Sequence, residues 1–433
     1  MPVGGATSLL HRYGTLGLIA TNTVAQGDTR EVGLDAMVGD GFTITRAIKS
    51  KKWPSVSANL EYAAVWGTLS HVDDVVPKIV DDERVAKVST MLEAAGRIDG
   101  IPERLAENTG LAFIGCYVLG MGFTMEPELA QEWIAADHRN ADVLFPYLNG
   151  EDLNSRPDAS ASRWVIDFGA RTETEASLYE LPMERIRQLI KPERLQNNRK
   201  VYRDYWWQYA EKRPALRQAI ADLSEVLVIA RVSKTVMPMR VQTRQVMSEA
   251  CVVFATDDYG DQAVLSSSLH QLWAITYGST LETRIRYTPS DVFETLPRPK
   301  TTERLESIGH LLERERQQIM LRRRLGLTKL YNLVNNPDVT TGSDRDIALL
   351  RDIHVEVDNA VICAFGWDDI ALKHGFYSYR SAERWSITTS ARIELLGRVL
   401  TENHRRAATS GEIPSYVESL VRTTDDHGIT HVV

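Results

Sequence analysis

The chain has 433 residues and a mass of 48.7 kDa, too long for one ordinary hydrophobic core, and this predicts two or three domains. Its net charge of −8 and sequence pI of about 5.8 argue against a protein that coats nucleic acid with its whole surface, so any DNA contact has to be local. Three widely separated cysteines exclude a disulfide framework and a C-x-x-C zinc site, and no apolar run is long enough to span a bilayer. We therefore expect a cytoplasmic protein without a membrane segment.

The first 72 residues show the alternating pattern of an α/β sheet. A short apolar strand is predicted from Leu16 to Ala20, a helix from Glu31 to Met37, and two more strands within residues 42–69. About seventy residues of this kind cannot bury both faces of a sheet. We therefore expect residues 1–72 to be the closing part of a larger α/β sheet.

The polar loop after the first strand has two interpretations. Thr21, Asn22, Thr23 and residues 26–28 follow the carboxyl end of a strand, where open α/β sheets bind their ligands. The same residues also suit a strand-to-helix turn with capping side chains. Neither G-x-G-x-x-G nor G-x-x-x-x-G-K-[ST] occurs in the chain, so a nucleotide site has little support.

Two segments of different character follow. Residues 73–114 are charged and mixed, and we interpret them as a linker region with a helix over residues 80–95. Residues 115–299 combine strands and capped helices without regular alternation, which is typical of an α+β domain. The fold class predicted for the whole chain is therefore α+β and multidomain.

The C-terminal part has helical periodicity. Apolar residues recur at helical intervals over residues 303–334, 344–365 and 388–406. Three helices would form a small bundle, which we assign to a domain of residues 300–410. The polar residues 411–433 are expected to be a flexible tail.

The stretch from Glu225 to Pro299 is the centre of the predicted function. Two β-branched apolar runs, Val226 to Ala230 and Cys251 to Ala255, predict buried strands that end in polar residues. Side chains suited to phosphates and base edges lie beside and after these strands, and we interpret the stretch as a DNA-reading module. Its candidate DNA-binding residues are Arg231, Ser233, Lys234, Thr235, Arg284, Arg286 and Tyr287.

Residues 185–217 form the most basic segment of the chain. Ten basic residues face three acidic ones, a net charge of +7, and five Tyr or Trp residues are interleaved with them. A local positive field with flat aromatic surfaces suits a phosphate backbone. Alternatively, the aromatic rings are buried and the Arg and Lys stems cover them. On the first interpretation, Arg199, Lys200 and Arg203 are further candidates for DNA binding.

Familiar catalytic and metal-binding patterns are absent from the sequence. H-E-x-x-H, G-x-S-x-G and P-D-(D/E)-x-K do not occur. His354, Glu356 and Asp358 are spaced by two, which separates neighbouring members by about 200° on a helix, so a structural pair of His354 with Asp358 is the better interpretation. We assign no catalytic, cofactor-binding or metal-binding residue from these patterns.

Many stretches between residue 14 and about residue 406 follow the order of a known family. They are GTLGLIATNTVAQGDTREVGL, AIKSKKWPSVSANLEYAAV, VLGMGFTM, DVLFPYLNGEDLNS, SRWVIDF, WWQYAEKRP, VLVIARVSKT, SSSLHQLWAITYGSTLETRIRYTPSDVFETLPRP, LGLTKLYNLVNNPD, LRDIHVEVDNAVICAFGWDDIAL and ARIELLGRVLTENHRR. On these residues the chain resembles the C-terminal two-thirds of a MmeI-like DNA adenine methyltransferase. That group contains fused type II restriction-modification enzymes and their methylase-only relatives.

The resemblance implies a function for each part of the chain. Residues 14 to about 70 would be the last strands of a class I methyltransferase sheet, residues from about 115 to 299 a target-recognition domain, and residues 300 to about 406 a helical C-terminal domain. In the family, an adenine is flipped out of double-stranded DNA and its N6 atom receives a methyl group from S-adenosylmethionine. The resemblance therefore implies double-stranded DNA as partner and S-adenosylmethionine as the cofactor of the complete enzyme.

The sequence departs from the family at one decisive place. The family's glycine-containing cofactor motif and its N-P-P-(Y/F) catalytic tetrapeptide precede the segment that begins here at Gly14, and neither occurs in this chain. The nuclease domain of fused members is absent as well. Because the tetrapeptide holds the flipped adenine against the methyl donor, we expect no catalytic residue and no cofactor binding in this chain alone.

Three hypotheses follow from the resemblance and the departure. The first is the DNA-recognition fragment of a site-specific adenine methyltransferase from a restriction-modification or phage-defence system, inert alone, whose reading frame begins at a truncation or frameshift. The second is the specificity subunit of a split enzyme, active only with a chain that carries the missing methyltransferase half. The third is a truncated gene product that folds poorly because half of its first sheet is missing.

Overall fold

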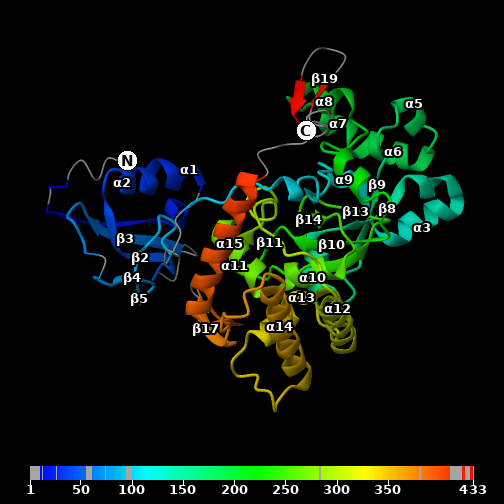
Figure 1. The fold of residues 1–433 in the computed structure, drawn as a ribbon. Helices are drawn as coiled ribbons and strands as arrows, with labels where there is room; N and C mark the ends of the chain where they lie inside the picture. Colours follow the sequence, from blue (N-terminus) through cyan, green and yellow to red (C-terminus); the bar gives the residue numbers. More distant parts are fainter. Residues whose placement is uncertain are drawn as a thin grey trace.

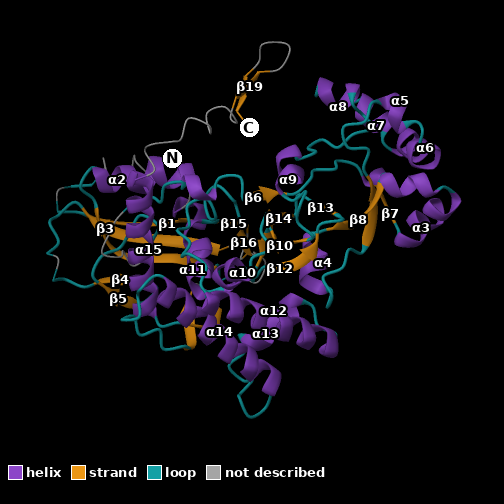
Figure 2. Ribbon diagram, turned by 45° about the vertical axis from the view of Figure 1, so that its right-hand side comes forward, coloured by secondary structure: helices purple, strands orange, loops and turns teal. Residues whose placement is uncertain are grey.

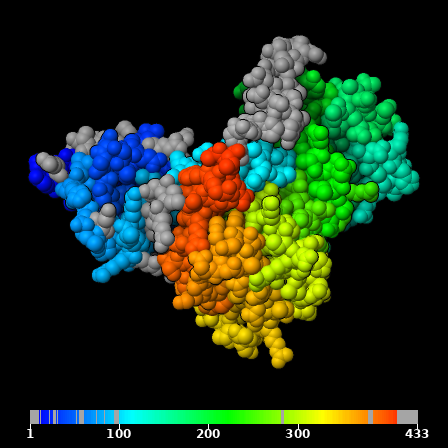
Figure 3. All heavy atoms as spheres, viewed as in Figure 1, coloured from blue at the N-terminus to red at the C-terminus, as the bar shows by residue number. Residues whose placement is uncertain are grey.

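A computed structural model gives the fold of the chain. An N-terminal unit lies beside a central body, and an outer lobe extends from the opposite side of that body (Figure 1). Figure 3 shows the N-terminal unit and the outer lobe standing apart, with the central body between them. The mixed α+β architecture predicted from the sequence is confirmed. The described residues are 10–11, 13–25, 27–54, 61–73, 75–93, 100–281, 284–379, 382–409, 422–424 and 430–432.

The N-terminal unit is a five-stranded sheet with the order β1-β3-β2-β4-β5. Its strands and helices have the predicted order, and its core includes Leu34, Phe42 and Ala63. The side chains of β1 alternate between exposed and half-buried, and β3 is its one partner strand in the described part of the chain. Of the polar loop after β1, Gln26 lies outside the described residues. The elements are β1 (Thr15–Thr21), α1 (Gly27–Arg30), α2 (Ala36–Gly39), β2 (Thr43–Lys52), β3 (Glu61–Thr68), β4 (Lys78–Val80) and β5 (Glu83–Val85).

The linker helix predicted over residues 80–95 is wrong where the structure describes it. Residues 78–85 form the hairpin β4–β5, and β4 pairs in parallel with β2. Asp81 and Asp82 both have positive φ, 47° and 69°, as the tight turn between paired strands requires, and Asp tolerates that conformation well. The pair therefore makes a turn where the charge pattern suggested a helix. Residues 94–99 lie outside the described part.

The central body is built on a four-stranded sheet with the order β12-β10-β14-β6. Every residue of β10 from Val226 to Ala230 is buried. Leu227 and Ile229 point into one hydrophobic core, and Val226 and Val228 point into another on the opposite face. The two apolar runs predicted as buried strands are confirmed, and they pair with each other. The elements are β6 (Ala112–Ile114), β10 (Glu225–Ala230), β11 (Val232–Ser233), β12 (Met239–Gln242), β14 (Cys251–Phe254), α10 (Tyr259–Ser266), α11 (Ser268–Tyr277), β15 (Ser279–Leu281) and β16 (Arg284–Arg286).

The C-terminal helices pack on the central sheet instead of forming a bundle of their own. Leu312, Leu330 and Val357 share the core of Val226 and Val228, while residues of the last long helix share the opposite core. Figure 2 shows α12, α13 and α14 on one side of the central strands. A hairpin, β17–β18, was not predicted, and the predicted tail lies mostly outside the described residues. The elements are α12 (Glu303–Arg323), α13 (Leu327–Val334), α14 (Arg345–Ala364), β17 (Gly375–Tyr379), β18 (Ala382–Ser386), α15 (Thr389–Thr409), β19 (Arg422–Thr424) and β20 (Thr430–Val432).

The outer lobe has its own sheet and its own core. The strand order is β13-β8-β9-β7, and helices α3 and α5–α8 surround it. Phe123, Val165 and Trp206 belong to the core of this lobe. The elements are β7 (Thr124–Met125), α3 (Pro127–Ala136), β8 (Leu144–Leu148), α4 (Gly150–Ser155), β9 (Arg163–Ile166), α5 (Glu173–Ala176), α6 (Glu180–Leu189), α7 (Lys191–Leu195), α8 (Lys200–Asp204), α9 (Pro214–Ala219) and β13 (Val246–Met247).

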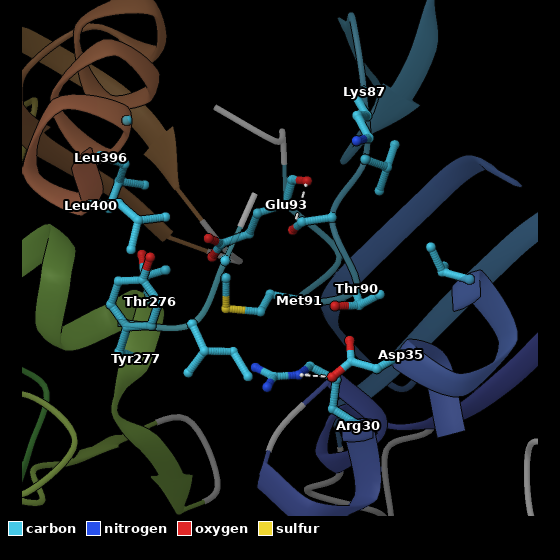
Figure 4. A pocket seen from close by; sticks show the side chains of 16 residues that line it. Arg30, Asp35, Lys87, Thr90, Met91, Glu93, Thr276, Tyr277, Leu396 and Leu400 are labelled. Atoms are coloured by element: carbon cyan, nitrogen blue, oxygen red, sulfur yellow. Dashed lines mark hydrogen bonds and ion pairs between the residues drawn. The ribbon is translucent and has the colours of Figure 1, made fainter. Parts of the chain in front are cut away.

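A cavity of about 320 Å³ separates the N-terminal unit from the central body. Arg30 and Asp35 form an ion pair on the side of the N-terminal unit, and Tyr277 and Leu400 stand opposite, on α11 and α15 (Figure 4). Met91 lies between the two sides. The lining of this cavity mixes charged and apolar groups.

In the described part of the chain, no helix is both long enough and apolar enough to cross a membrane.

A glycine sets how closely α13 approaches α4. The periodic stretch 303–334 is two helices and not one, because Arg324 adopts a positive φ of 53° and ends α12. Gly326 then caps α13. A Cβ atom at Gly326 would stand 2.3 Å from the carbonyl carbon and oxygen of Ser155, at the end of α4. Residue 326 can therefore carry no side chain unless the two helices move apart.

Replacing Gly326 by alanine should lower the free energy of unfolding by about 1–3 kcal/mol, because the added methyl group meets backbone atoms that cannot rotate away. Urea denaturation monitored by circular dichroism would measure it. Gly342→Ala is the matched control, since nothing lies within 4 Å of a Cβ atom there. Equal stability of the two variants would contradict the close approach of α13 to α4.

Two buried histidines are each bonded to a tyrosine hydroxyl. The Nδ1–H of His270 donates to the carbonyl oxygen of Leu265 at 2.7 Å, so its Nε2 accepts from the hydroxyl of Tyr287 at 2.8 Å. The Nε2 of His354 lies 2.8 Å from the hydroxyl of Tyr331. Burial lowers the pKa of both imidazoles to about 4. Both rings are therefore neutral at pH 7, and His270 is a packed residue of α11.

Acid should destabilise the fold through these two rings. An unfolded histidine titrates near pH 6.5, so between about pH 6.5 and pH 4 the unfolded chain binds protons that the folded chain excludes. The free energy of unfolding should fall across that window, by up to about 3 kcal/mol for each ring, and level off below it. Urea denaturation at pH 7, 5.5 and 4.5 measures this. His354→Gln should reduce the dependence of the free energy of unfolding on pH, whereas His310→Gln, at an exposed residue, should not. A constant free energy of unfolding from pH 7 to 4.5 would refute the neutral state of the two buried rings.

Candidate nucleic-acid interface

An open groove of about 800 Å³ lies where the central sheet, α4 and α13 meet. Its lining comes from α4 and α13, which we call its walls, from the residues after β10 and before β14, which we call its floor, and from β16. Three of the arginines predicted to bind DNA lie in it. The lining residues are Gly150, Glu151, Asn154, Ser155, Arg231, Val232, Glu249, Ala250, Arg284, Arg286, Thr328 and Lys329.

Strand pairing brings distant residues of the sequence to this one place. β10 and β14 are antiparallel with Ala230 opposite Cys251, so the residue after β10 meets the residues before β14. The backbone N–H of Arg231 donates to the carbonyl oxygen of Ala250 at 2.7 Å. β11 pairs with β16, with Val232 opposite Arg286. Arg284 and Arg286, two apart on β16, therefore lie on the same side of that strand, beside Arg231.

Cationic side chains dominate the groove. Arg231, Arg284, Arg286 and Lys329 oppose only two acidic residues among those that line it, Glu151 and Glu249. Burial, followed by repulsion from Arg286 and Arg213, lowers the pKa of the Arg231 guanidinium below its usual range. Positive charges held this close together in the free protein favour an anionic ligand.

Two polar atoms in the groove have no hydrogen-bond partner in the described part of the chain. They are Nε of Arg231 and Oε2 of Glu249, and both are shielded from solvent. A buried polar atom without a partner costs about 1–3 kcal/mol, and a ligand that bonds to the same side chains would offset part of that cost. The groove is therefore a candidate binding site on chemical as well as electrostatic grounds.

Ser233, Lys234 and Thr235, also predicted to bind DNA, do not line the groove. The Ser233 and Thr235 side chains are buried, and the Ser233 hydroxyl accepts a hydrogen bond from the backbone N–H of Thr235 at 3.1 Å. The same hydroxyl lies 3.4 Å from Oδ1 of Asn154. Lys234 is exposed, and its carbonyl oxygen accepts from Arg384 at 3.0 Å. Ser233 and Thr235 thus shape the turn beside the groove, and their burial argues against direct contact with DNA.

The structure corrects the assignment of Tyr287. Its side chain is 1% exposed, its ring contacts Phe254 and its hydroxyl donates to His270. Side chains alternate along a strand, so Tyr287 points inward together with Ile285 while Arg284 and Arg286 point outward. Tyr287 is a core residue and cannot reach a duplex.

The basic segment 185–217 uses much of its charge inside the outer lobe. Arg185 donates to the carbonyl oxygens of Gly122 and Thr124, and Arg194 to those of Val118 and Leu119. Four of the five interleaved aromatic side chains are buried, which favours the structural interpretation for them. The buried ones are Tyr202, Trp206, Trp207 and Tyr209.

Arg199, Lys200 and Arg203 lie at α8 and outside the groove. Arg199 donates to the hydroxyl of Tyr202 at 3.0 Å, and Arg203 donates to two backbone carbonyl oxygens. Lys200 is 82% exposed and lies 4.0 Å from Asp204. The three residues therefore form a surface separate from the groove, and their prediction as DNA contacts stays a prediction.

Comparison with known proteins relates the outer lobe and part of the central body to a known family. Residues 116–300 match the family model described as "MmeI, target recognition domain". These residues are therefore similar to an MmeI-type target recognition domain.

The fold extends the likeness beyond this domain. The structure of the type IIL restriction-modification enzyme MmeI in complex with DNA matches 90% of this chain and 50% of its own, with a TM-score of 0.66 and 16% identity. The chain thus spans about half the length of that enzyme. The type IIG restriction endonuclease BpuSI matches 82% of this chain and 48% of its own, with 10% identity and a TM-score of only 0.30. No curated protein matches the chain by sequence.

Removing the Tyr287 hydroxyl should affect stability and not DNA binding. Tyr287→Phe leaves Nε2 of the buried His270 without its donor, and the free energy of unfolding should fall by about 1–3 kcal/mol. Tyr205→Phe, on a side chain that is 51% exposed, is the control. Denaturation and duplex binding would both be measured. Unchanged stability combined with weaker binding would restore Tyr287 as a DNA contact.

Proposed function

We propose that this chain is the DNA-recognition portion of a site-specific, adenine-N6 DNA methyltransferase from a restriction-modification or phage-defence system. The observation that carries the proposal is the cationic groove within and beside the target recognition domain, where Arg231, Arg284, Arg286 and Lys329 converge. The similarity of the fold to MmeI bound to DNA supports it. The partner we propose is double-stranded DNA.

The groove offers both kinds of contact that sequence-specific binding needs. Lys329 and Arg286 are exposed and suit phosphate oxygens, which fix position and affinity. Arg231, Asn154 and Glu249 lie on the floor and on the α4 wall, where donors and acceptors suit base edges. An acidic chain with one local basic groove would confine DNA to this face, in keeping with the net charge of −8.

We assign no methyl-transfer step to residues of this chain. The sequence contains neither the glycine-containing cofactor motif nor the N-P-P-(Y/F) tetrapeptide. The turn after β1 directs Val24 and Ala25 into the core and is closed by a 2.7 Å hydrogen bond between the Thr21 and Thr23 hydroxyls. We propose no contact between the residues of this turn and S-adenosylmethionine. Adenine methylation by the complete enzyme is part of the proposal and rests on the family resemblance.

Duplex binding measured at low and at physiological salt tests DNA recognition. Wild-type affinity should fall as salt rises, because each neutralised phosphate releases counterions. Lys329→Ala should weaken binding to all duplexes equally and reduce the slope of log affinity against log salt by about 1. Arg345→Ala, exposed and outside the groove, is the matched control. A folded sample that binds no mixed-sequence duplex at either salt concentration would refute the function.

The open edge of β1 favours a second candidate, the specificity subunit of a split enzyme. Among the residues that the structure describes, β1 is an edge strand of seven residues, and it carries Ile19, which is 60% exposed. An unpaired apolar strand edge is a ready surface for a strand of another polypeptide. That polypeptide would supply the cofactor motif and the tetrapeptide.

Mixing the chain with such a polypeptide, labelled S-adenosylmethionine and DNA tests the split enzyme. Methylation should appear only in the mixture, and Ile19→Lys should abolish it while duplex binding by this chain persists. Val75→Lys, at a residue that is 83% exposed and away from β1, is the control. Loss of duplex binding together with methylation would indicate misfolding, and full methylation with Ile19→Lys would exclude docking at β1.

A further inference from the structure

We infer that Arg231 and Glu249 together read one G·C base pair, an assignment that rests on the proposed DNA-recognition function. The two residues lie side by side on the floor of the groove, because Arg231 follows β10 and Glu249 precedes β14. The hydrogen bond from the backbone of Arg231 to Ala250 fixes this arrangement. Neither position depends on a long flexible loop.

The two side chains do not satisfy each other. Glu249 partly offsets the lowering of the pKa of the Arg231 guanidinium, yet within the described ranges no ion pair of 4.0 Å or less joins the two side chains. Nε of Arg231 and Oε2 of Glu249 both lack a hydrogen-bond partner there. Arg286 and Arg213, the other charged groups that act on Arg231, are cations and cannot accept its hydrogen bonds. Because these two atoms are shielded from solvent, a base meets the rest of each half-buried side chain, namely the fork of the Arg231 guanidinium and the other carboxylate oxygen of Glu249.

The chemistry of the pair matches one base pair and not the other. A guanidinium only donates, and its fork spans two adjacent acceptors; a carboxylate only accepts. In the major groove guanine presents N7 and O6 next to each other, and the N4 amino group of the paired cytosine follows. In an A·T pair the N6 amino donor of adenine stands beside N7, where it would oppose the second arm of the fork. Arg231 therefore reads guanine, and Glu249 the cytosine opposite.

Selection from random-sequence duplexes, followed by sequencing and binding measurements, tests the assignment. The wild-type chain should enrich a site with an invariant G·C pair, and exchanging that pair for A·T should weaken wild-type binding by about 5- to 150-fold. Glu249→Gln, which keeps the shape of the side chain, and Arg231→Ala should each lose that preference at this one position. Preferences at the other positions of the site should remain.

Two controls separate reading of a base pair from other roles. Lys329→Ala should weaken all duplexes equally without changing the selected site, and Arg345→Ala should change neither affinity nor site. Melting of each variant shows whether it is folded. If Glu249→Gln and Arg231→Ala keep the full site preference of the wild type, the inference is overturned, and a lower melting temperature with that preference intact assigns the pair to structure alone.

Failure of the proposed function gives a different result. A folded wild-type chain that binds no duplex and enriches no site would refute both the function and the base-pair assignment. A wild-type chain that enriches a defined site, with variants that enrich the same site, would refute only the assignment.

Discussion

The central strand β10 is buried on both faces, and the rest of the fold depends on this. Alternate residues of one short strand enter two separate hydrophobic cores, and each core needs its own cover. Helices from the C-terminal third provide it on both sides. A strand with no solvent-facing side cannot slip in register without exposing apolar groups, so the ends of β10 and β14 stay fixed relative to each other. The polar residues that follow and precede these strands are held where the floor of the groove forms.

The distribution of positive charge explains how an acidic protein keeps a local cationic site. In the outer lobe, arginines such as Arg194 turn inward and donate to backbone carbonyl oxygens, so their charge holds loops together. Arg351 does the same in the helical part, where it donates to several carbonyl oxygens between Leu333 and Val339. Arg231 is different, because it is half-buried and lines the open groove, whereas Arg194 is buried inside the outer lobe. A count of basic residues cannot distinguish an arginine that holds loops together from one that is open to a ligand. The surroundings of each guanidinium in the fold determine its role.

The sequence predicted the elements that follow from short-range rules. β-Branched runs gave the buried strands β10 and β14, and Gly366, with a φ of 73°, marks the end of α14 where helical periodicity stops. The β4–β5 turn was missed because Asp81 and Asp82 lie in a run of charged residues that is typical of an exposed helix. Their positive φ, which makes the turn, is visible only in the structure. Tyr287 was predicted to bind DNA from its residue type alone. The alternation of side chains along β16 places its ring in the core.

Half of the groove was predictable, and the other half depends on contacts distant in sequence. Arg231, Arg284 and Arg286 stand at strand ends or on a strand, so local pattern found them. Glu249 precedes β14 and was not predicted as a site residue. Its importance depends on Arg231, which the pairing of β10 with β14 places beside it. Lys329 lies in an ordinary amphipathic helix, and nothing near it in the sequence shows that the helix reaches α4.

The missing side chain of Gly326 has a consequence for how this architecture can be recombined. The family segment ends at residue 300, yet Thr328 and Lys329 on α13 complete the groove wall only because α13 packs against the backbone of Ser155. A graft that carried residues 116–300 into another protein would leave one wall of the groove behind. A graft that keeps the whole groove therefore has to extend past residue 300 and include α13.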